Sequence, residues 1–160
     1  MVTSSDLGVI SGSQLQCFKE CPFNKGYAIY GGHCIKLYMY FTSHANALGV
    51  CAADGAHLYH FKSLTKDRQP VIDLLYDNGI DHADVTLSFL WVGATDIVSE
   101  GSFVWSDGSP LPVGSDVWVS PLEPNDAGTG EDCARVILPE VKINDGPCSG
   151  GARFVCQIDF

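Results

Sequence analysis

One stretch of this sequence contains Glu123-Pro124-Asn125-Asp126, then Glu131-Asp132-Cys133, and finally Asn144-Asp145. Carboxylate and carboxamide oxygens are the protein ligands that calcium prefers, because this hard cation takes about six to eight oxygen atoms. Carboxamides among the carboxylates limit the repulsion between like charges and leave a bound metal partly neutralised. The stretch therefore predicts a calcium site whose ion can still accept neutral hydroxyl groups. The alternative is a solvated acidic loop, which is the ordinary interpretation of a single Glu on a protein surface.

The composition limits the class of protein. A chain of 160 residues is long enough for one domain with a buried core. Acidic residues outnumber Lys and Arg by 19 to 9, which gives a net charge of −10. Nucleic acid is therefore not expected as a partner, because phosphate contacts need clustered basic side chains. No apolar run reaches the roughly 18 residues that a membrane span requires. Residues 1–5 lack the basic start and apolar stretch of a secretion signal.

The cysteines indicate an oxidising compartment. There are seven of them, and they form neither a CxxC pair nor a zinc-finger spacing with histidine: Cys17, Cys21, Cys34, Cys51, Cys133, Cys148 and Cys156. This many cysteines in an acidic domain predict disulfide bonds and a secreted, extracellular protein. The odd number leaves one cysteine for a bridge between chains or for a free thiol.

Hydrophobic periodicity predicts an α+β domain with two helices. One helix is expected from about residue 43 to residue 53, capped by Thr42 or Ser43. The second is expected over residues 67–77, with Pro70 tolerated only in its first turn. Strands are expected over residues 34–41, 89–93, 102–106, 132–138 and 152–158. In the first of these strands, the alternation places one set of side chains on the buried face: Ile35, Leu37, Met39 and Phe41.

Residues 107–132 are rich in Gly, Pro, Ser, Asp and Asn and show no helical or strand period. Loops of this length inside compact domains are usually functional or disordered. Because this loop carries the oxygen ligands, a functional loop is the favoured interpretation.

These features resemble the C-type lectin-like domain over about residues 21–157. The resemblance rests on short motifs in a fixed order: Cys21-Pro22, Gly32-His33-Cys34, Trp91-Val92-Gly93-Ala94, Glu100-Gly101-Ser102-Phe103-Val104-Trp105, Glu123-Pro124-Asn125-Asp126, Glu131-Asp132-Cys133, Ile143-Asn144-Asp145 and Phe154-Val155-Cys156. It implies the α+β C-type lectin-like fold, with two helices, small antiparallel sheets and a long calcium-binding loop. Residues 17–160 would form the domain and residues 1–16 an N-terminal extension. One departure is Ile143, which stands where the family usually has Trp.

The resemblance also implies the covalent framework and the metal ligands. The implied disulfides are Cys21–Cys34, Cys51–Cys156 and Cys133–Cys148. The implied ligands of a principal calcium site are Glu123, Asn125, Glu131, Asn144 and Asp145, with the Glu123–Pro124 peptide bond in the cis form. The implied ligands of an auxiliary calcium site are Asp96, Glu100, Asp126 and Glu131. The alternative for Asp96 and Glu100 is that they are ordinary acidic residues of a turn.

Cys17 lies outside this disulfide framework, and it predicts a disulfide-linked homodimer. The rival interpretation is that Cys17, instead of Cys21, pairs with Cys34.

The function that the resemblance implies is calcium-dependent carbohydrate binding. Two vicinal sugar hydroxyls would complete the calcium shell, and Glu123, Asn125, Glu131, Asn144 and Asp145 would also contact the sugar. In the family, Glu-Pro-Asn at this place goes with mannose-, GlcNAc- or fucose-type sugars, whereas Gln-Pro-Asp goes with galactose. Such a lectin would serve glycan or microbial surface recognition in innate immunity. The alternative is a lectin-like structural or protein-binding domain, associated with matrix or mineral, that binds no sugar.

An enzyme is not expected. The sequence contains no GxSxG, HExxH, P-loop or GxGxxG motif, and its five histidines have no partnered nucleophile motif. Two of the carboxylates could in principle form a glycosidase pair. They are better explained as calcium ligands, because a carboxylate bound to calcium is a poor general acid.

Overall fold

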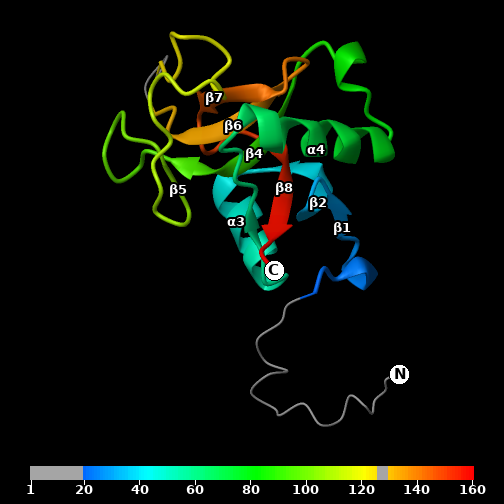
Figure 1. The fold of residues 1–160 in the computed structure, drawn as a ribbon. Coiled ribbons are helices and arrows are strands. Elements are labelled where there is room, and N and C mark those ends of the chain that lie inside the picture. The colour runs from blue at the N-terminus through cyan, green and yellow to red at the C-terminus, as the bar shows by residue number, and fades with distance from the viewer. Residues whose placement is uncertain (1–19, 126–129) are drawn as a thin grey trace.

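The structure is a computed structural model that describes residues 20–125 and 130–160 (Figure 1). In chain order its elements are η1 (Phe23–Lys25), β1 (Ala28–Tyr30), β2 (His33–Thr42), α3 (His44–Ala53), β3 (His57–Leu58), α4 (Leu64–Asp77), η2 (His82–Asp84), β4 (Ser88–Thr95), β5 (Val104–Trp105), β6 (Cys133–Leu138), β7 (Lys142–Gly146) and β8 (Ala152–Ile158). Within the described ranges, no helix is long and apolar enough to cross a bilayer.

The strands join in one sheet with the order β1-β2-β8-β4-β6-β7, while β3 pairs with β8 and β5 pairs with β4. The β4–β8 pairing is parallel. The other pairings of named strands in the described chain are antiparallel. Helix α3 contacts β3 and β8, and helix α4 contacts β1 and β2 (Figure 1). The α+β class is confirmed, but the parallel pairing joins what the sequence suggested as separate small sheets.

Helix α3 lies where the sequence predicts it. It begins at His44, and Ser43 is its N-cap, with Oγ accepting the N–H of Asn46 at 3.3 Å. A side-chain oxygen at this position satisfies one of the N–H groups that a helix start leaves without a partner.

The predicted start of helix α4 is wrong. The helix begins at Leu64, so Pro70 lies in its interior and not in its first turn. Ser63 caps the helix, and the carboxylate of Asp67 accepts two backbone N–H groups of the preceding segment, at 2.8 and 2.9 Å. These contacts start the helix one turn earlier than the spacing of apolar residues indicates, despite the hydrogen bond that an interior proline removes.

Strand β2 follows the predicted alternation only in its first half. Ile35 and Leu37 are buried, whereas Met39 and Phe41 are exposed, contrary to the prediction. Pairing with β8 is regular from Cys34 to Tyr38 and is then interrupted by a shift in register before Thr42. Beyond Tyr38 the strand therefore no longer presents its alternate side chains to the core.

Some apolar residues of the long loop form part of the core. Leu111, Val117 and Trp118 of the loop are buried in the same cluster as Ile143 and Phe103, which precedes the loop. The rings of Phe103 and Trp118 meet edge to face, 5.3 Å between centroids, and the Trp118 indole N–H donates to the carbonyl of Pro112 at 3.0 Å. The loop has no helix or strand among its described residues, yet buried side chains hold it against the sheet.

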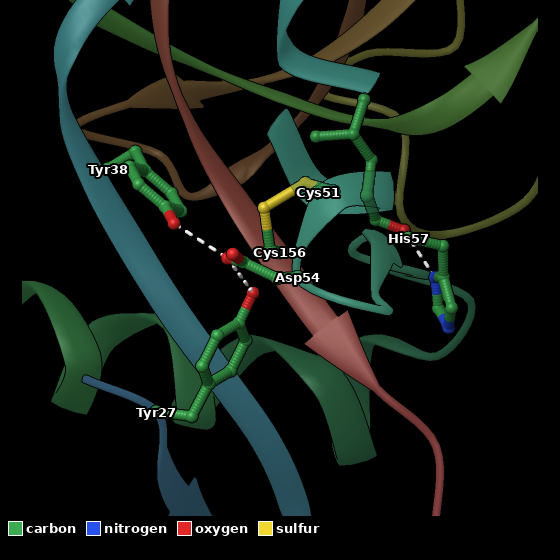
Figure 2. The surroundings of a disulfide bond; sticks show 7 residues. Tyr27, Tyr38, Cys51, Asp54, His57 and Cys156 are labelled. Atoms are coloured by element: carbon green, nitrogen blue, oxygen red, sulfur yellow. Dashed lines mark hydrogen bonds between the residues drawn. A yellow bond between two sulfur atoms is a disulfide. The ribbon is translucent and has the colours of Figure 1, made fainter. Parts of the chain in front are cut away.

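The described chain contains the disulfides Cys21–Cys34, Cys51–Cys156 and Cys133–Cys148, which are the pairs that the resemblance implies. Figure 2 shows the second of these, which joins α3 to β8. Beside it, the hydroxyls of Tyr27 and Tyr38 both donate to Oδ2 of Asp54, at 2.8 and 2.6 Å. These two hydrogen bonds therefore connect β2 and the segment before β1 to the C-terminal end of α3. Cys17 lies outside the described residues.

Candidate functional site

The long loop and strand β7 bring the predicted principal ligands together. Asn144 and Asp145 are on β7, and Glu123 and Asn125 are on the loop. The backbone N–H of Asn125 donates to Oδ1 of Asp145 at 3.2 Å, and its side-chain amide donates to Oε2 of Glu123 at 3.3 Å. The Glu123–Pro124 peptide bond is cis. Glu131 lies near enough for its charge to act on Glu123.

The five predicted ligands differ in how deeply their side chains are buried. Asn125 is exposed, Glu123, Glu131 and Asn144 are half-buried, and Asp145 is buried. The site is therefore shallow, with its most solvent-accessible amide at the rim and a carboxylate at the bottom. A ligand from solvent can reach such a site without a rearrangement of the core.

The carboxylates of this site destabilise one another in the absence of a cation. Burial raises the pKa of the Glu123 carboxyl to about 7, and a hydrogen bond with Asp145 and the charges of Asp145 and Glu131 add to the increase. Oε1 of Glu123 is buried and has no hydrogen-bond partner. Crowded, half-buried carboxylates favour the protonated form, and a bound cation removes that penalty. The donor set and the unpartnered oxygen therefore fit a hard divalent cation.

Arg135 is a residue of this site that the sequence does not single out. It is the cross-strand partner of Asn144 in the β6–β7 pairing, and its Nε donates to Oδ1 of Asn144 at 3.0 Å. Its guanidinium lies 3.6 Å from the centre of the Phe89 ring. Burial lowers the pKa of Arg135, whereas the nearby carboxylates of the site raise it. Arg135 is identified by the register of β6 and β7. The sequence does not predict β7 as a strand, so this register could not be inferred from it.

A second group of carboxylates lies beside the loop that follows β4. Asp96, Glu100 and Asp132 each place one carboxylate oxygen within 4.8 Å of the others. Asp96 is buried; its Oδ2 accepts the N–H of Gly101 at 2.8 Å, and its Oδ1 has no hydrogen-bond partner. The N–H of Asp96 also donates to the carbonyl of Asp132 at 3.0 Å, which fixes the two segments side by side.

This group differs in part from the predicted auxiliary site. Asp96 and Glu100 belong to it as predicted, but the third carboxylate comes from Asp132, which the sequence-based ligand set omits. The predicted ligand Asp126 lies outside the described residues. Asp132 directly follows Glu131 in the sequence, and its place in this group depends on its backbone contact with Asp96, 36 residues earlier in the chain. The local sequence contains no signal for that long-range contact.

Comparison with known proteins establishes the family. The sequence model of the lectin C-type domain matches residues 42–158, so this chain belongs to the C-type lectin domain family. The chain is 30% identical over 113 residues to the hemolymph lipopolysaccharide-binding protein of Periplaneta americana, an alignment that covers 69% of this chain and 43% of that protein. The chain thus spans less than half of that relative. The family consists of binding proteins, and the expectation that the domain is not an enzyme agrees with it.

Solved structures confirm the fold. The structure of an EPNH mutant of CEL-I, a C-type lectin from Cucumaria echinata, matches with a TM-score of 0.70 and 26% identity, covering 89% of this chain and 99% of that one. A calcium-independent type II antifreeze protein matches with a TM-score of 0.64 and 22% identity, covering 83% and 91% of the two chains. The same fold therefore serves a lectin and a protein that acts without calcium.

Proposed function

We propose that this domain binds mannose-, GlcNAc- or fucose-type sugars through a calcium ion held by Glu123, Asn125, Glu131, Asn144 and Asp145. The observation that carries the proposal is the contact of Asn125 with both Glu123 and Asp145 in one shallow site, where Oε1 of Glu123 is buried without a hydrogen-bond partner. Calcium, when bound, would supply a positive centre that accepts sugar hydroxyl oxygens. An acidic surface loop without a ligand has no reason to bury a carboxylate oxygen in this way.

The neighbouring amide and carboxylate suit a sugar hydroxyl. Asn125 offers an N–H donor, and Glu123 offers a carboxylate acceptor 3.3 Å away. A hydroxyl can donate to the carboxylate while it accepts from the amide, so each side chain keeps a hydrogen bond when sugar replaces solvent. Asn144 and Glu131 would form the corresponding pair for the second hydroxyl. An epimer that leaves one of these groups unpaired would bind less well.

Further proposals concern the domain boundaries, the compartment and the biological role of the protein. We propose that residues 17–160 form the carbohydrate-recognition domain of a secreted, extracellular protein and that residues 1–16 are an extension. Recognition of microbial surfaces in innate immunity is the proposed role, supported by the relative named for lipopolysaccharide binding.

Asp96, Glu100 and Asp132 are the proposed ligands of a second calcium ion. Linkage through Cys17 would place two weak sites in one homodimer and raise their effective concentration.

The second candidate function is a lectin-like structural or protein-binding domain, without sugar binding. The likeness to a calcium-independent antifreeze protein supports it, and so does the contact of Arg135 with a predicted calcium ligand.

One experiment separates the two candidate functions. Purified protein is passed over immobilised mannose and immobilised galactose in millimolar calcium, and then eluted with EDTA. The proposal predicts retention on mannose and release by EDTA. A Glu123→Gln variant removes one carboxylate from the Glu123–Asn125 pair while it keeps a side-chain oxygen, and it should pass through the mannose column. Failure of the wild-type protein to bind mannose, GlcNAc or fucose in calcium would favour the structural alternative.

A further inference from the structure

Arg135 places a permanent positive charge against the proposed calcium site. Nε of Arg135 donates to Oδ1 of Asn144, the side-chain oxygen with which Asn144 would bind the metal. Glu131, Asp145 and Glu123 all act on the guanidinium through their charges. In the metal-free domain, the guanidinium therefore neutralises part of the negative charge that calcium would otherwise neutralise.

The packing around Arg135 holds the guanidinium in this place. The ring of Phe89 lies under it at 3.6 Å, which is a favourable arrangement for a cation on an aromatic face. On another side it contacts the backbone of Gly146, where an added Cβ would lie 2.5 Å from Cζ of Arg135. A glycine at this position of β7 leaves the space that the guanidinium occupies. The side chain is half-buried, so solvent screens its charge only in part.

Calcium and the guanidinium need the same oxygen and the same negative charge. An Asn oxygen has two lone pairs, but two cations that share it repel each other. The repulsion is larger at a half-buried site than on an open surface, because the effective dielectric constant is lower. Occupation of the site by calcium therefore requires the guanidinium to move away or to remain close at an energetic cost.

We infer that Arg135 is a built-in competitor of calcium, which stabilises the metal-free site and lowers its calcium affinity. The inference rests on the proposed calcium site. It deepens the proposed function by adding a residue that sets the calcium concentration at which sugar binding begins. A domain of this kind stays folded without metal and releases sugar when calcium falls, at a threshold that Arg135 raises.

The test replaces Arg135 with methionine, which keeps an apolar stem over Phe89 and removes the charge and the donor. Calcium binding is measured by titration calorimetry without sugar, and thermal unfolding is measured in EDTA. We expect Arg135→Met to bind calcium about tenfold more tightly, or better, since a charge repulsion at close range has been removed. We also expect a lower unfolding temperature in EDTA, because the carboxylates lose their internal counter-charge.

Arg153→Met is the matched control. Arg153 also stacks on an aromatic ring, 4.7 Å over Phe41, and its Nε donates to a carbonyl at 3.0 Å, that of Met39. The change removes the same net charge at a place where no calcium ligand is predicted, so calcium affinity should stay within about twofold of wild type by long-range screening. A gain as large as that of Arg135→Met would overturn the inference, because it would show a general charge effect.

Gly146→Ala tests the position of the Arg135 guanidinium without changing the net charge of the protein. Its Cβ should displace the guanidinium, so calcium affinity should again rise. If Arg135→Met and Gly146→Ala bind calcium no more tightly than wild type, while wild type does bind calcium, the inference is wrong and the proposed calcium site stands. Calcium binding by Arg135→Met alone would support the inference and revise the function of the wild type. Absence of calcium binding in all variants would overturn both.

Discussion

The backbone N–H of Ile143 donates to the carbonyl of Val117 at 2.8 Å, and this bond ties strand β7 to the long loop. A second bond, from the N–H of Val119 to the carbonyl of Ile143 at 2.8 Å, completes the bridge. Asn144 directly follows Ile143, and Glu123 follows the bridged segment of the loop by a few residues. The two halves of the principal site are therefore held in register by backbone hydrogen bonds and by the buried side chain of Ile143.

Ile143→Ala should lower both stability and calcium affinity. Removal of a fully buried Ile side chain costs about 2–5 kcal/mol in the free energy of unfolding, through lost burial and the cavity that remains. Because the cavity lies between β7 and the loop, the spacing of Glu123 and Asn144 should loosen, and calcium should bind more weakly. Denaturant unfolding in EDTA and calcium titration measure the two effects.

Ile35→Ala is the matched control for this prediction. Ile35 is also fully buried, but it lies on β2 and not on β7 or the loop. We expect a similar loss of stability with calcium affinity close to that of wild type. Equal calcium affinities for Ile143→Ala and wild type would contradict the role of Ile143 in holding the loop.

The residues that the sequence identifies are those with a distinctive chemistry and a local signal. Glu123 and Asn125 are two positions apart beside a proline, and Ser43 precedes a helical pattern, so no knowledge of the sheet is required to recognise them. Arg135 and Asp132 are different. An arginine on a strand is usually a surface residue, and its role here depends on the pairing with Asn144. Long-range register is the information that local pattern does not contain.

The same limit explains the errors in the fold. Burial of Met39 and Phe41 was predicted from a strict alternation, but the irregular pairing of β2 with β8 ends that alternation after Tyr38. The start of α4 depends on the side chain of Asp67, which accepts N–H groups from the residues before the helix. A hydrophobic stripe records which side of a helix is buried; it does not record such a polar contact at the helix start.

Calcium affinity should fall as the pH drops below about 7. The pKa of Glu123 is raised from its ordinary value of 4.5 to about 7, mainly by burial and then by Asp145 and Glu131. Calcium needs the deprotonated carboxylate, so binding between these pH values should release a proton. Titration calorimetry in two buffers of different ionisation enthalpy counts the proton. A calcium affinity that is constant from pH 5 to pH 7.5 would contradict this prediction.

The raised pKa of Glu123 also predicts how the stability of the metal-free domain depends on pH, and this trend is opposite to that of calcium affinity. With its pKa raised on folding, Glu123 binds more protons in the folded state than in the unfolded chain between about pH 4.5 and 7. The free energy of unfolding in EDTA should therefore fall as pH rises through that window. Glu123→Gln should weaken this pH dependence, because its amide does not titrate. Full retention of the trend in Glu123→Gln would assign it to another group.

Asp132→Asn should remove one calcium ion and leave the other. Asp132 belongs to the group with Asp96 and Glu100, and a neutral amide in its place weakens a hard-cation site. We expect the stoichiometry of calcium binding to fall from two ions to one, while elution from mannose still requires EDTA. Asp84→Asn is the matched control, since Asp84 is an exposed acid on η2 and should leave the stoichiometry unchanged. Two bound calcium ions in Asp132→Asn would rule out this assignment.

The double variant Glu123→Gln with Asn125→Asp should move the preference from mannose toward galactose. The exchange keeps one carboxylate and one carboxamide in the loop but reverses their order. The amide of Asn125 donates to the carboxylate of Glu123 at 3.3 Å, so the two side chains are neighbours in the site. A sugar hydroxyl that donated at position 123 would now have to accept there, so the hydroxyl geometry that satisfies both groups changes. Competition titrations with free mannose and free galactose measure the ranking. The single variant Asn125→Asp, with two carboxylates and no amide in the pair, is the control and should weaken binding of both sugars. If the double variant still ranks mannose above galactose while calcium binding is retained, the order of donor and acceptor in this loop does not set the sugar preference.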